Sequence, residues 1–187
     1  RAAKEKLLLG AIGTPLWASI TVAQHTDKDP YLRDGCLLNW GAHEIDLALH
    51  LLGPAKPLAA AVRVSRGSEL TPHPTDDMAD FILQHDSGCT SNIHLDYVTK
   101  PQIRSTTIVG DKGQLVIDLV QRWCFITDLD GKQEEFTATD SWDSNYLNEM
   151  KAFLARCNGQ NDGIGATGED GLATLKIIEA VKEKAKA

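Results

Sequence analysis

The stretch that decides the fold is residues 35–53, which read GCLLNWGAHEIDLALHLLG. Most of these residues are Leu, Ile, Ala and Trp, which belong in a protein core, and Gly53 followed by Pro54 is typical of a helix end. The sequence therefore predicts a helix over residues 35–52. At about 100° per residue, one narrow sector of this helix carries four polar side chains: Asn39, His43, Asp46 and His50.

This polar stripe is the candidate site, because polar groups on a core-grade helix need hydrogen-bond partners, a ligand or water. His43 is the candidate catalytic residue, since imidazole titrates near neutral pH and suits general acid–base work. Asn39 and Asp46, one turn to either side, are candidates for orienting the imidazole or a substrate. The alternative is that His43 and Asp46 are satisfied polar groups of the core.

A metal site on the same helix is a further alternative. His43, Asp46 and His50 have i, i+3 and i+7 spacing, which could present three ligands on one face. Three ligands spread over two turns rarely converge on one ion without a distant fourth group, and no such group is evident. We therefore predict no bound metal, and His50 is as readily a structural residue at the helix end.

Outward from this helix, the sequence predicts two kinds of segment. Upstream, residues 1–9 read as the end of a helix, 16–23 as a strand and 25–34 as a polar loop. Downstream, apolar runs separated by tight turns predict strands at 59–66, 78–85, 89–98, 103–109, 114–119, 123–127 and 133–138. Helical periodicity then returns at residues 141–156 and 169–185, around a Gly- and Asn-rich surface loop.

Consecutive antiparallel hairpins with helices gathered at the two ends predict an α+β fold. We expect an open, mostly antiparallel sheet with helices on one face. The other face is expected to be partly apolar and covered by a second subunit, in a dimer or tetramer. The side chains that suggest this apolar face are Leu83, Ile93, Leu95, Tyr97, Ile108 and Val116, and two strand histidines, His85 and His94, are expected at the surface.

The composition and net charge of the chain exclude some classes of binding partner. The chain has 187 residues, enough for one well-packed domain, and a formal net charge of −7 with a pI of about 5.3. An acidic surface argues against nucleic acid or an anionic membrane as partner, and no apolar run approaches the roughly 20 residues of a membrane span. The four cysteines form no CxxC pair, which indicates reduced thiols and a cytoplasmic protein: Cys36, Cys89, Cys124 and Cys157.

Two further features bear on ligands. Lys100 and Arg104 follow the predicted strand at 89–98, where basic side chains near a sheet edge could meet an anionic or hydroxylated substrate. A solvated strand end is the alternative. The chain has no Gly-x-Gly-x-x-Gly between a strand and a helix and no run of parallel βαβ units, so by itself it is not expected to bind a dinucleotide.

The order of these motifs resembles the C-terminal domain of the Gfo/Idh/MocA oxidoreductases, the family of glucose–fructose oxidoreductase and inositol dehydrogenase. Residues 10–13 (GAIG) resemble the family's entry to its second domain, and residues 35–47 resemble its G-x-L-x-D-x-G-x-H-x-x-D helix. The resemblance covers nearly the whole chain, and its other segments are DMADFILQHDSG at 77–88, RSTTIVGDKGQLVID at 104–118, YLNEMKAFL at 146–154 and GEDGLATLKIIEAV at 168–181.

The resemblance implies that residues 1–187 form the C-terminal sheet domain of a two-domain oxidoreductase whose N-terminal Rossmann domain, absent from this chain, binds NAD or NADP. It implies that the intact protein is a dehydrogenase or reductase of a sugar, polyol or similar hydroxylated small molecule. His43 would then be the proton shuttle, with Asn39, Asp46, Arg104 and Lys100 contacting substrate. This fragment alone should be inactive, because a lysine that usually completes the site belongs to the N-terminal domain.

One position departs from the family pattern. Asn39 stands where the family often has Asp, and a neutral amide neither raises the pKa of a neighbouring imidazole by charge nor shares its proton. A non-catalytic role, as a ligand-sensing, regulatory or assembly module of the same fold, therefore stays open as the alternative. The sequence leaves the substrate, the choice between NAD and NADP, and the oligomer number undecided.

Overall fold

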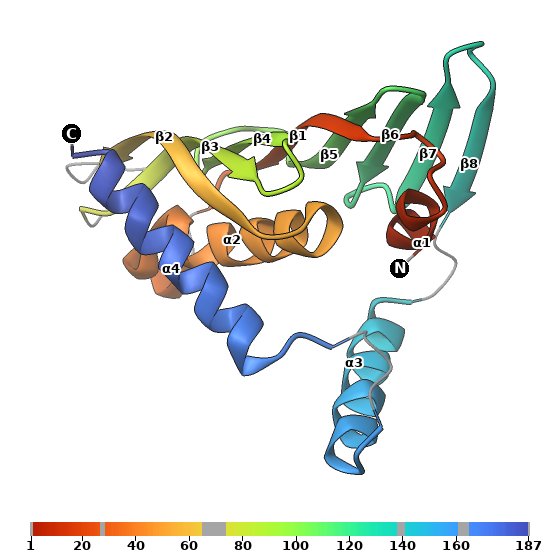
Figure 1. Ribbon diagram of the computed structural model, residues 1–187. Coiled ribbons are helices and arrows are strands. Elements are labelled where there is room, and N and C mark those ends of the chain that lie inside the picture. Colours follow the sequence, from red (N-terminus) through yellow and green to blue (C-terminus); the bar gives the residue numbers. More distant parts are fainter. Residues whose placement is uncertain (1, 27–28, 65–73, 138–140, 161–164, 187) are drawn as a thin grey trace.

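The computed structural model describes residues 2–26, 29–64, 74–137, 141–160 and 165–186. Eight strands form one sheet, and four helices lie along the chain before, between and after them (Figure 1). The elements in chain order are α1 Ala2–Leu8, β1 Pro15–Ala23, α2 Asp29–Leu52, β2 Ala55–Val64, β3 Asp76–His85, β4 Thr90–Asp96, β5 Ile103–Gly110, β6 Gly113–Asp118, β7 Trp123–Asp128, β8 Gln133–Thr137, α3 Trp142–Cys157 and α4 Gly168–Lys184.

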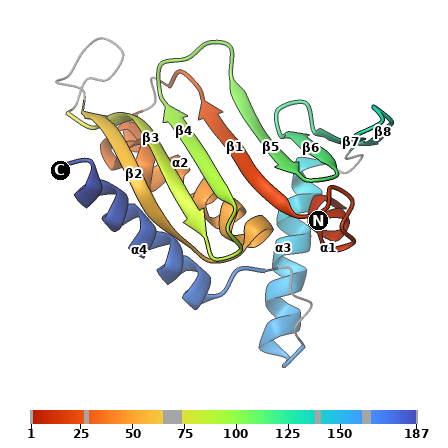
Figure 2. The same ribbon diagram turned by 45° about the horizontal axis from the view of Figure 1, so that its top comes forward.

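The sheet is open and mostly antiparallel, which confirms the predicted α+β class. Its strand order is β2-β3-β4-β1-β5-β6-β7-β8, so β1 is inserted between two hairpins (Figure 2). β1 pairs in parallel with β4 and antiparallel with β5. This insertion places the carboxyl end of β1 at the middle of the sheet, beside the end of β4.

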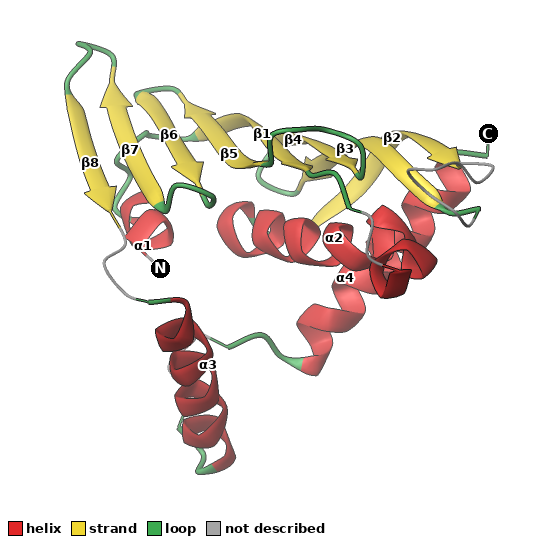
Figure 3. Ribbon diagram, turned by 180° about the vertical axis from the view of Figure 1, so that it is seen from behind, coloured by secondary structure: helices red, strands yellow, loops and turns green. Residues whose placement is uncertain are grey.

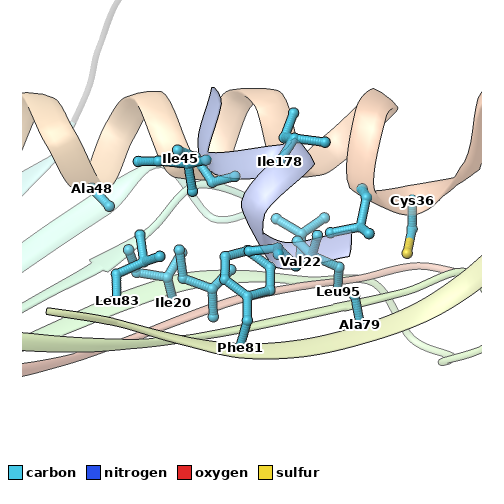
Figure 4. Close-up of a cluster of buried hydrophobic side chains, with 14 of the residues drawn as sticks. Ile20, Val22, Cys36, Ile45, Ala48, Ala79, Phe81, Leu83, Leu95 and Ile178 are labelled. Carbon is cyan, nitrogen blue, oxygen red and sulfur yellow. The ribbon is translucent and has the colours of Figure 1, made fainter. Parts of the chain in front are cut away.

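The main core lies between the sheet and the helices α2 and α4. From α2, Cys36, Ile45 and Ala48 point to the sheet, and Ile178 of α4 joins them (Figure 4). Period-2 alternation in the strands supplies the other half of this core. The strand side chains that meet the helices here are Ile20, Val22, Ala79, Phe81, Leu83, Ile93 and Leu95.

Two features seat α2 against the sheet. Gly35 interrupts the helical backbone with φ 76° and ψ 161°, which favours glycine, and a side chain there would collide with the carboxylate of Asp76. Oδ2 of Asp76 accepts a hydrogen bond from the backbone N–H of Leu37, 2.8 Å away, so the carboxylate stabilises the start of the regular helix. Further along, a Cβ at Gly41 would lie 3.1 Å from Leu95, so glycine allows close approach to β4.

The predicted elements correspond to the observed ones with three corrections. The chain just before Gly35, predicted as loop, is helical from Asp29, and the two helical pieces meet at the Gly35 kink. Of the six side chains predicted on the face of the sheet that the helices leave uncovered, only Val116 lies there. The prediction is wrong for the other five, which are 0% exposed and lie on the helix-covered side: Leu83, Ile93, Leu95, Tyr97 and Ile108. His85, predicted at the surface, is 2% exposed.

The uncovered sheet face is mixed rather than apolar. Trp17 is 45% exposed and Ile82 is 38% exposed, but most of their neighbours on this face are Ser, Thr, Asn and charged residues. All four helices lie on the opposite side of the sheet, and α3 projects away from it (Figure 3). None of the described helices has the length and apolar character that crossing a membrane would require.

Candidate functional site

The His43 side chain lies at a cavity of about 370 Å³ where the carboxyl end of β1, the middle of α2 and the start of β5 meet. A volume of this size falls in the range of small-molecule sites, roughly 300–1,000 Å³. Its polar lining consists mainly of amide, hydroxyl and imidazole groups, which can both donate and accept hydrogen bonds, together with the Glu44–Arg104 ion pair. The lining residues are Val22, Gln24, His25, Thr26, Asn39, Trp40, His43, Glu44, Gln102 and Arg104.

The wall formed by residues 24–26 is pinned to the chain that follows β4. The backbone N–H groups of Gln24, His25 and Thr26 donate to the carbonyls of Asp96, Thr99 and Tyr97, at 3.0, 2.7 and 3.2 Å. Asp96 organises that turn, since its Oδ1 accepts from the backbone N–H groups of Val98 and Thr99, at 2.8 and 2.7 Å. This side of the cavity is therefore a fixed wall built by backbone hydrogen bonds.

His43 itself is exposed, and no side chain or backbone group in the described part of the chain hydrogen-bonds to its imidazole. The structure thus gives His43 no partner of the kind a satisfied core histidine would have. Asn39, one turn earlier, does not contact it: its amide Nδ2 donates to the hydroxyl of Tyr97 at 3.1 Å. Tyr97 is buried and its ring meets Trp40 edge to face, with centroids 5.0 Å apart.

Sequence reasoning missed Glu44, the neighbour of His43. Its side chain is 1% exposed, and Oε1 accepts from Nε and Nη2 of Arg104 at 3.0 and 2.8 Å. Burial raises the pKa of Glu44, and the adjacent guanidinium opposes that rise. The ion pair connects α2 to β5 and fixes the guanidinium of Arg104 in the cavity wall. No signal in the sequence marks this pair, because the two residues are 60 positions apart.

Asp46 and His50 line a second and larger cavity, of about 900 Å³, between α2 and the start of α4. His43 and Arg104 line it as well, so the two cavities share a wall. Burial raises the pKa of Asp46, Asp170 raises it further, and the two histidines oppose the rise. Burial lowers the pKa of His50, with Lys4 acting in the same direction. The predicted stripe is therefore divided, with Asn39 at the smaller cavity, Asp46 and His50 at the larger, and His43 at both.

Of the two basic residues predicted at the sheet edge, the structure brings only Arg104 to the site. Lys100 is exposed in the turn after β4 and lines neither cavity. Among the described residues, no group of three or more His, Cys, Asp or Glu side chains is arranged to hold a metal ion. The spacing of His43, Asp46 and His50 along one helix therefore does not produce a chelating cluster.

The strand histidines hold the sheet together instead of lying free at its surface. Nδ1 of His85 lies 2.8 Å from the carbonyl of Gly53, and Nε2 lies 2.9 Å from Oγ of Ser91. His94 lies between two carboxylates, with Nδ1 2.8 Å from Asp80 and Nε2 2.9 Å from Asp96. His94 is on the uncovered face, and these contacts link β3 and β4 there.

A G-x-G-x-x-G pattern lies just before α4. Residues 163–168 spell G-x-G-x-x-G before α4, but residues 163 and 164 lie outside the described part and the pattern follows α3, not a strand. At the start of α4, Oδ2 of Asp170 accepts from the backbone N–H of Thr167, and Oγ1 of Thr167 accepts from the N–H of Asp170. This capping box, with Glu169 beside it, puts carboxylates where a dinucleotide would place its pyrophosphate.

Comparison with known proteins gives one family. The model of the GFO/IDH/MocA C-terminal domain matches residues 1–116. A D-apiose dehydrogenase of Rhizobium rhizogenes is 29% identical over 205 residues, covering 99% of this chain and 58% of that protein. A D-apiose dehydrogenase of Paraburkholderia graminis is 28% identical over 193 residues, covering 91% of this chain and 50% of that protein. The chain thus spans little more than half the length of these curated relatives.

Solved structures share the fold at low sequence identity. An oxidoreductase from Agrobacterium radiobacter, in complex with NAD+, L-tartaric acid and magnesium, has a TM-score of 0.79 and 24% identity, covering 99% of this chain and 58% of that one. Levoglucosan dehydrogenase, in complex with NADH and levoglucosan, has a TM-score of 0.83 and 16% identity, covering 98% of this chain and 60% of that one.

Proposed function

The chain belongs to the GFO/IDH/MocA family, and from that premise we propose that it is the substrate-binding and oligomerisation domain of an NAD(P)-dependent oxidoreductase. The substrate class is a sugar, polyol or similar hydroxylated small molecule. The observation that carries this proposal is the cavity beside His43, where an exposed imidazole meets amide, hydroxyl and guanidinium groups that can hydrogen-bond to a hydroxylated ligand. The two relatives named D-apiose dehydrogenase support the same substrate class.

The residues of this chain divide the work on the substrate. His43 takes the hydroxyl proton when an alcohol is oxidised and returns it in the reverse direction, as a general base and acid. Arg104, held by Glu44, donates hydrogen bonds to substrate oxygens, and Gln24, His25 and Asn39 complete the donor set. Asp46 supports the site from the larger cavity, which His43 also lines. Amide and imidazole side chains of this kind suit a ligand with hydroxyl groups, because a hydroxyl group both accepts and donates hydrogen bonds.

The nicotinamide cofactor would supply hydride acceptance and donation when bound. The described residues of this chain do not form a dinucleotide-binding site. The described sheet has no doubly wound parallel half, and the G-x-G-x-x-G at 163–168 precedes a helix whose first backbone N–H groups are already capped by the side chains of Thr167 and Asp170. NAD or NADP is therefore proposed to bind mainly to an N-terminal Rossmann domain outside this chain. That the relatives extend well beyond the matched length supports such a domain.

Replacing His43 tests the catalytic assignment in the intact natural polypeptide. His43→Ala should lower kcat by roughly 10²–10⁴-fold if the imidazole moves the proton. His50→Ala is the matched control, since His50 lies two turns along the same helix and does not line the smaller cavity. It should leave kcat within a few-fold of wild type. Equal effects of the two substitutions, or none from His43→Ala, would contradict the assignment.

The second candidate function is a non-catalytic ligand-sensing or assembly module of the same fold. The observation that favours it is Asn39, whose amide is bonded to Tyr97 and supplies no carboxylate to His43. The two candidates differ in whether the intact protein turns over any alcohol or carbonyl compound. A screen of sugars and polyols with NAD+ and NADP+, followed at the absorbance of the reduced nicotinamide, separates them.

We propose that copies of the protein pair through the uncovered sheet face, where Trp17 and Ile82 are exposed among mostly polar side chains. Such a mixed face suits a homodimer or tetramer interface, which sedimentation of Trp17→Lys against wild type would test. The described cysteines are all free thiols, which supports a reducing, cytoplasmic location.

A further inference from the structure

In the wall of the smaller cavity, a positive and a negative side chain neutralise each other. Apart from the imidazoles of His25 and His43, the charged side chains that line this cavity in the described part of the chain are Glu44 and Arg104. Oε1 of Glu44 lies 3.0 Å from Nε and 2.8 Å from Nη2 of Arg104, so the two charges are in direct contact. A ligand in this cavity therefore meets a guanidinium whose charge the protein already balances.

The two partners differ in how they face the cavity. The side chain of Glu44 is 1% exposed and that of Arg104 is 34% exposed, so the guanidinium meets the ligand and the carboxylate lies behind it. Arginine binds carboxylates and phosphates most strongly through two N–H groups on one edge of the guanidinium, and Glu44 occupies the Nε–Nη2 edge. No group in the described residues accepts from Nη1, which therefore remains as a donor for single ligand oxygens.

Burial makes Glu44 dependent on Arg104. It raises the pKa of Glu44, and the adjacent guanidinium opposes that rise. A carboxylate or phosphate on the ligand would have to share the guanidinium with Glu44 or displace Glu44 from it. Sharing gathers two negative charges around one cation, and displacement leaves a buried carboxylate without its partner. Both outcomes penalise an anionic ligand and leave an uncharged ligand unaffected.

The remaining polar groups of the wall also suit an uncharged ligand. They are the amides of Gln24, Asn39 and Gln102 and the hydroxyl of Thr26. Amide and hydroxyl side chains both donate and accept hydrogen bonds, and so do the hydroxyl groups of a sugar or polyol. An ionised carboxylate only accepts, so it would match the donors of this wall and leave the acceptors unpaired.

We propose that Glu44 sets the charge preference of the site: by neutralising Arg104, it makes the cavity select uncharged, polyhydroxylated substrates over substrates that carry a carboxylate or a phosphate. Glu44 does so from behind the wall, as a positioning residue that acts through Arg104. The inference rests on the proposed function, which makes this cavity the substrate site. It narrows the substrate class from hydroxylated small molecules in general to uncharged ones.

The test compares an uncharged substrate with an acid of the same configuration. The substrate is the sugar or polyol that the intact natural polypeptide oxidises fastest, and the acid is its uronic or aldonic counterpart, such as D-glucuronate for D-glucose or D-gluconate for D-glucitol. The measured quantity is the acid preference, defined as the KM of the substrate divided by the inhibition constant of the acid. In the wild type the acid should bind more weakly than the substrate, by roughly tenfold or more.

The variant is Glu44→Gln, which keeps the size of the side chain and an acceptor oxygen for Arg104 but removes the negative charge. The acid preference should rise by roughly 10–100-fold, because the guanidinium charge is no longer balanced. Structural damage to the cavity would instead weaken binding of both ligands and leave the acid preference unchanged. Glu44→Gln/Arg104→Gln removes both charges, so its acid preference should return to that of the wild type.

The matched control is Glu179→Gln on α4. Glu179 is 71% exposed and lines neither cavity, so this substitution removes the same charge from the protein but not from the site. Its acid preference should equal that of the wild type. An equal rise in Glu44→Gln and Glu179→Gln would overturn the inference, as would no rise in Glu44→Gln.

The wild type alone can also overturn the inference, so the test does not depend on the folding of a variant. Tighter binding of the acid than of the uncharged substrate contradicts the proposed charge preference directly. Turnover of a sugar or polyol with an unchanged acid preference in Glu44→Gln means that the inference is wrong and the proposed function stands. Absence of turnover of any sugar or polyol with NAD+ and NADP+ means that the proposed function has failed, and the inference fails with it.

Discussion

Replacing Arg104 by Met should destabilise the domain by stranding a buried charge. Glu44 is 1% exposed, and its carboxylate is paired with this guanidinium. Removing one partner of a fully buried ion pair costs about 3–5 kcal/mol, because the remaining charge stays desolvated. Arg104 is 34% exposed, so water reaches the vacated position and reduces the cost. We expect a loss of about 2–3 kcal/mol in the free energy of unfolding.

The assay is urea unfolding of the 187-residue chain, followed by tryptophan fluorescence, with thermal unfolding alongside. For a chain of this size, the expected loss corresponds to a fall in Tm of roughly 5–10 °C. The control is Arg104→Met combined with Glu44→Gln, which removes the stranded charge and should recover most of the stability. Single substitution Glu44→Gln should cost less than Arg104→Met, since the amide oxygen still accepts from the guanidinium.

The pH dependence of this variant has a fixed sign. Without Arg104, burial alone acts on Glu44 and raises its pKa further in the folded state. When the pKa of a carboxyl is higher in the folded protein than in the unfolded chain, the ionised carboxyl destabilises the fold. The destabilisation is therefore complete at a pH above the folded-state pKa of Glu44, and it shrinks as the pH falls toward the unfolded-state pKa. A loss that is independent of pH, or a double variant no more stable than Arg104→Met, would refute the stranded-charge argument.

Two further substitutions test how the site is held. Burial lowers the pKa of His94, but the carboxylates of Asp80 and Asp96 outweigh it and raise the pKa. These contacts therefore stabilise the fold at a pH below the unfolded-state pKa of His94, and the stabilisation is lost as the pH rises through its folded-state pKa. His94→Gln should cost about 1 kcal/mol at pH 6 and less at pH 9 by urea unfolding; an equal cost at both would contradict the ion-pair reading. Gly35→Ala should cost about 2–3 kcal/mol in the same assay, because its φ of 76° disfavours a side chain and the new Cβ would displace Asp76. A loss below 1 kcal/mol would contradict the importance of the kink.

Most elements could be predicted from the sequence because the residues that end helices and form turns lie next to those elements in the chain. Gly53 with Pro54 ends α2, and turns such as Asp86-Ser87-Gly88 separate strands whose side chains alternate with period 2. Alternation defines two faces of a strand but does not say which face the helices cover. The side chains predicted on the uncovered face therefore lie on the helix-covered face, since Leu83 and Ile93 pack against α2 and α4.

The site was predictable only in part, for a related reason. His43 is reached from helical spacing alone; on the structure it lines the smaller cavity, and its catalytic role stays a prediction. Glu44 could not be reached, because a charged residue on a helix normally lies in water and its partner Arg104 is brought to it by β5 pairing with β1. The pinning of residues 24–26 likewise depends on the parallel pairing of β1 and β4.

The measurement that tests the central claim most directly is a fluorescence titration of the intact natural polypeptide with NADH and NADPH. The proposal of an oxidoreductase predicts saturable binding of at least one of them, with a change in nicotinamide fluorescence, in wild type and in His43→Ala alike. Absence of binding to either nucleotide would contradict the oxidoreductase assignment and leave a sheet domain used for ligand sensing or assembly.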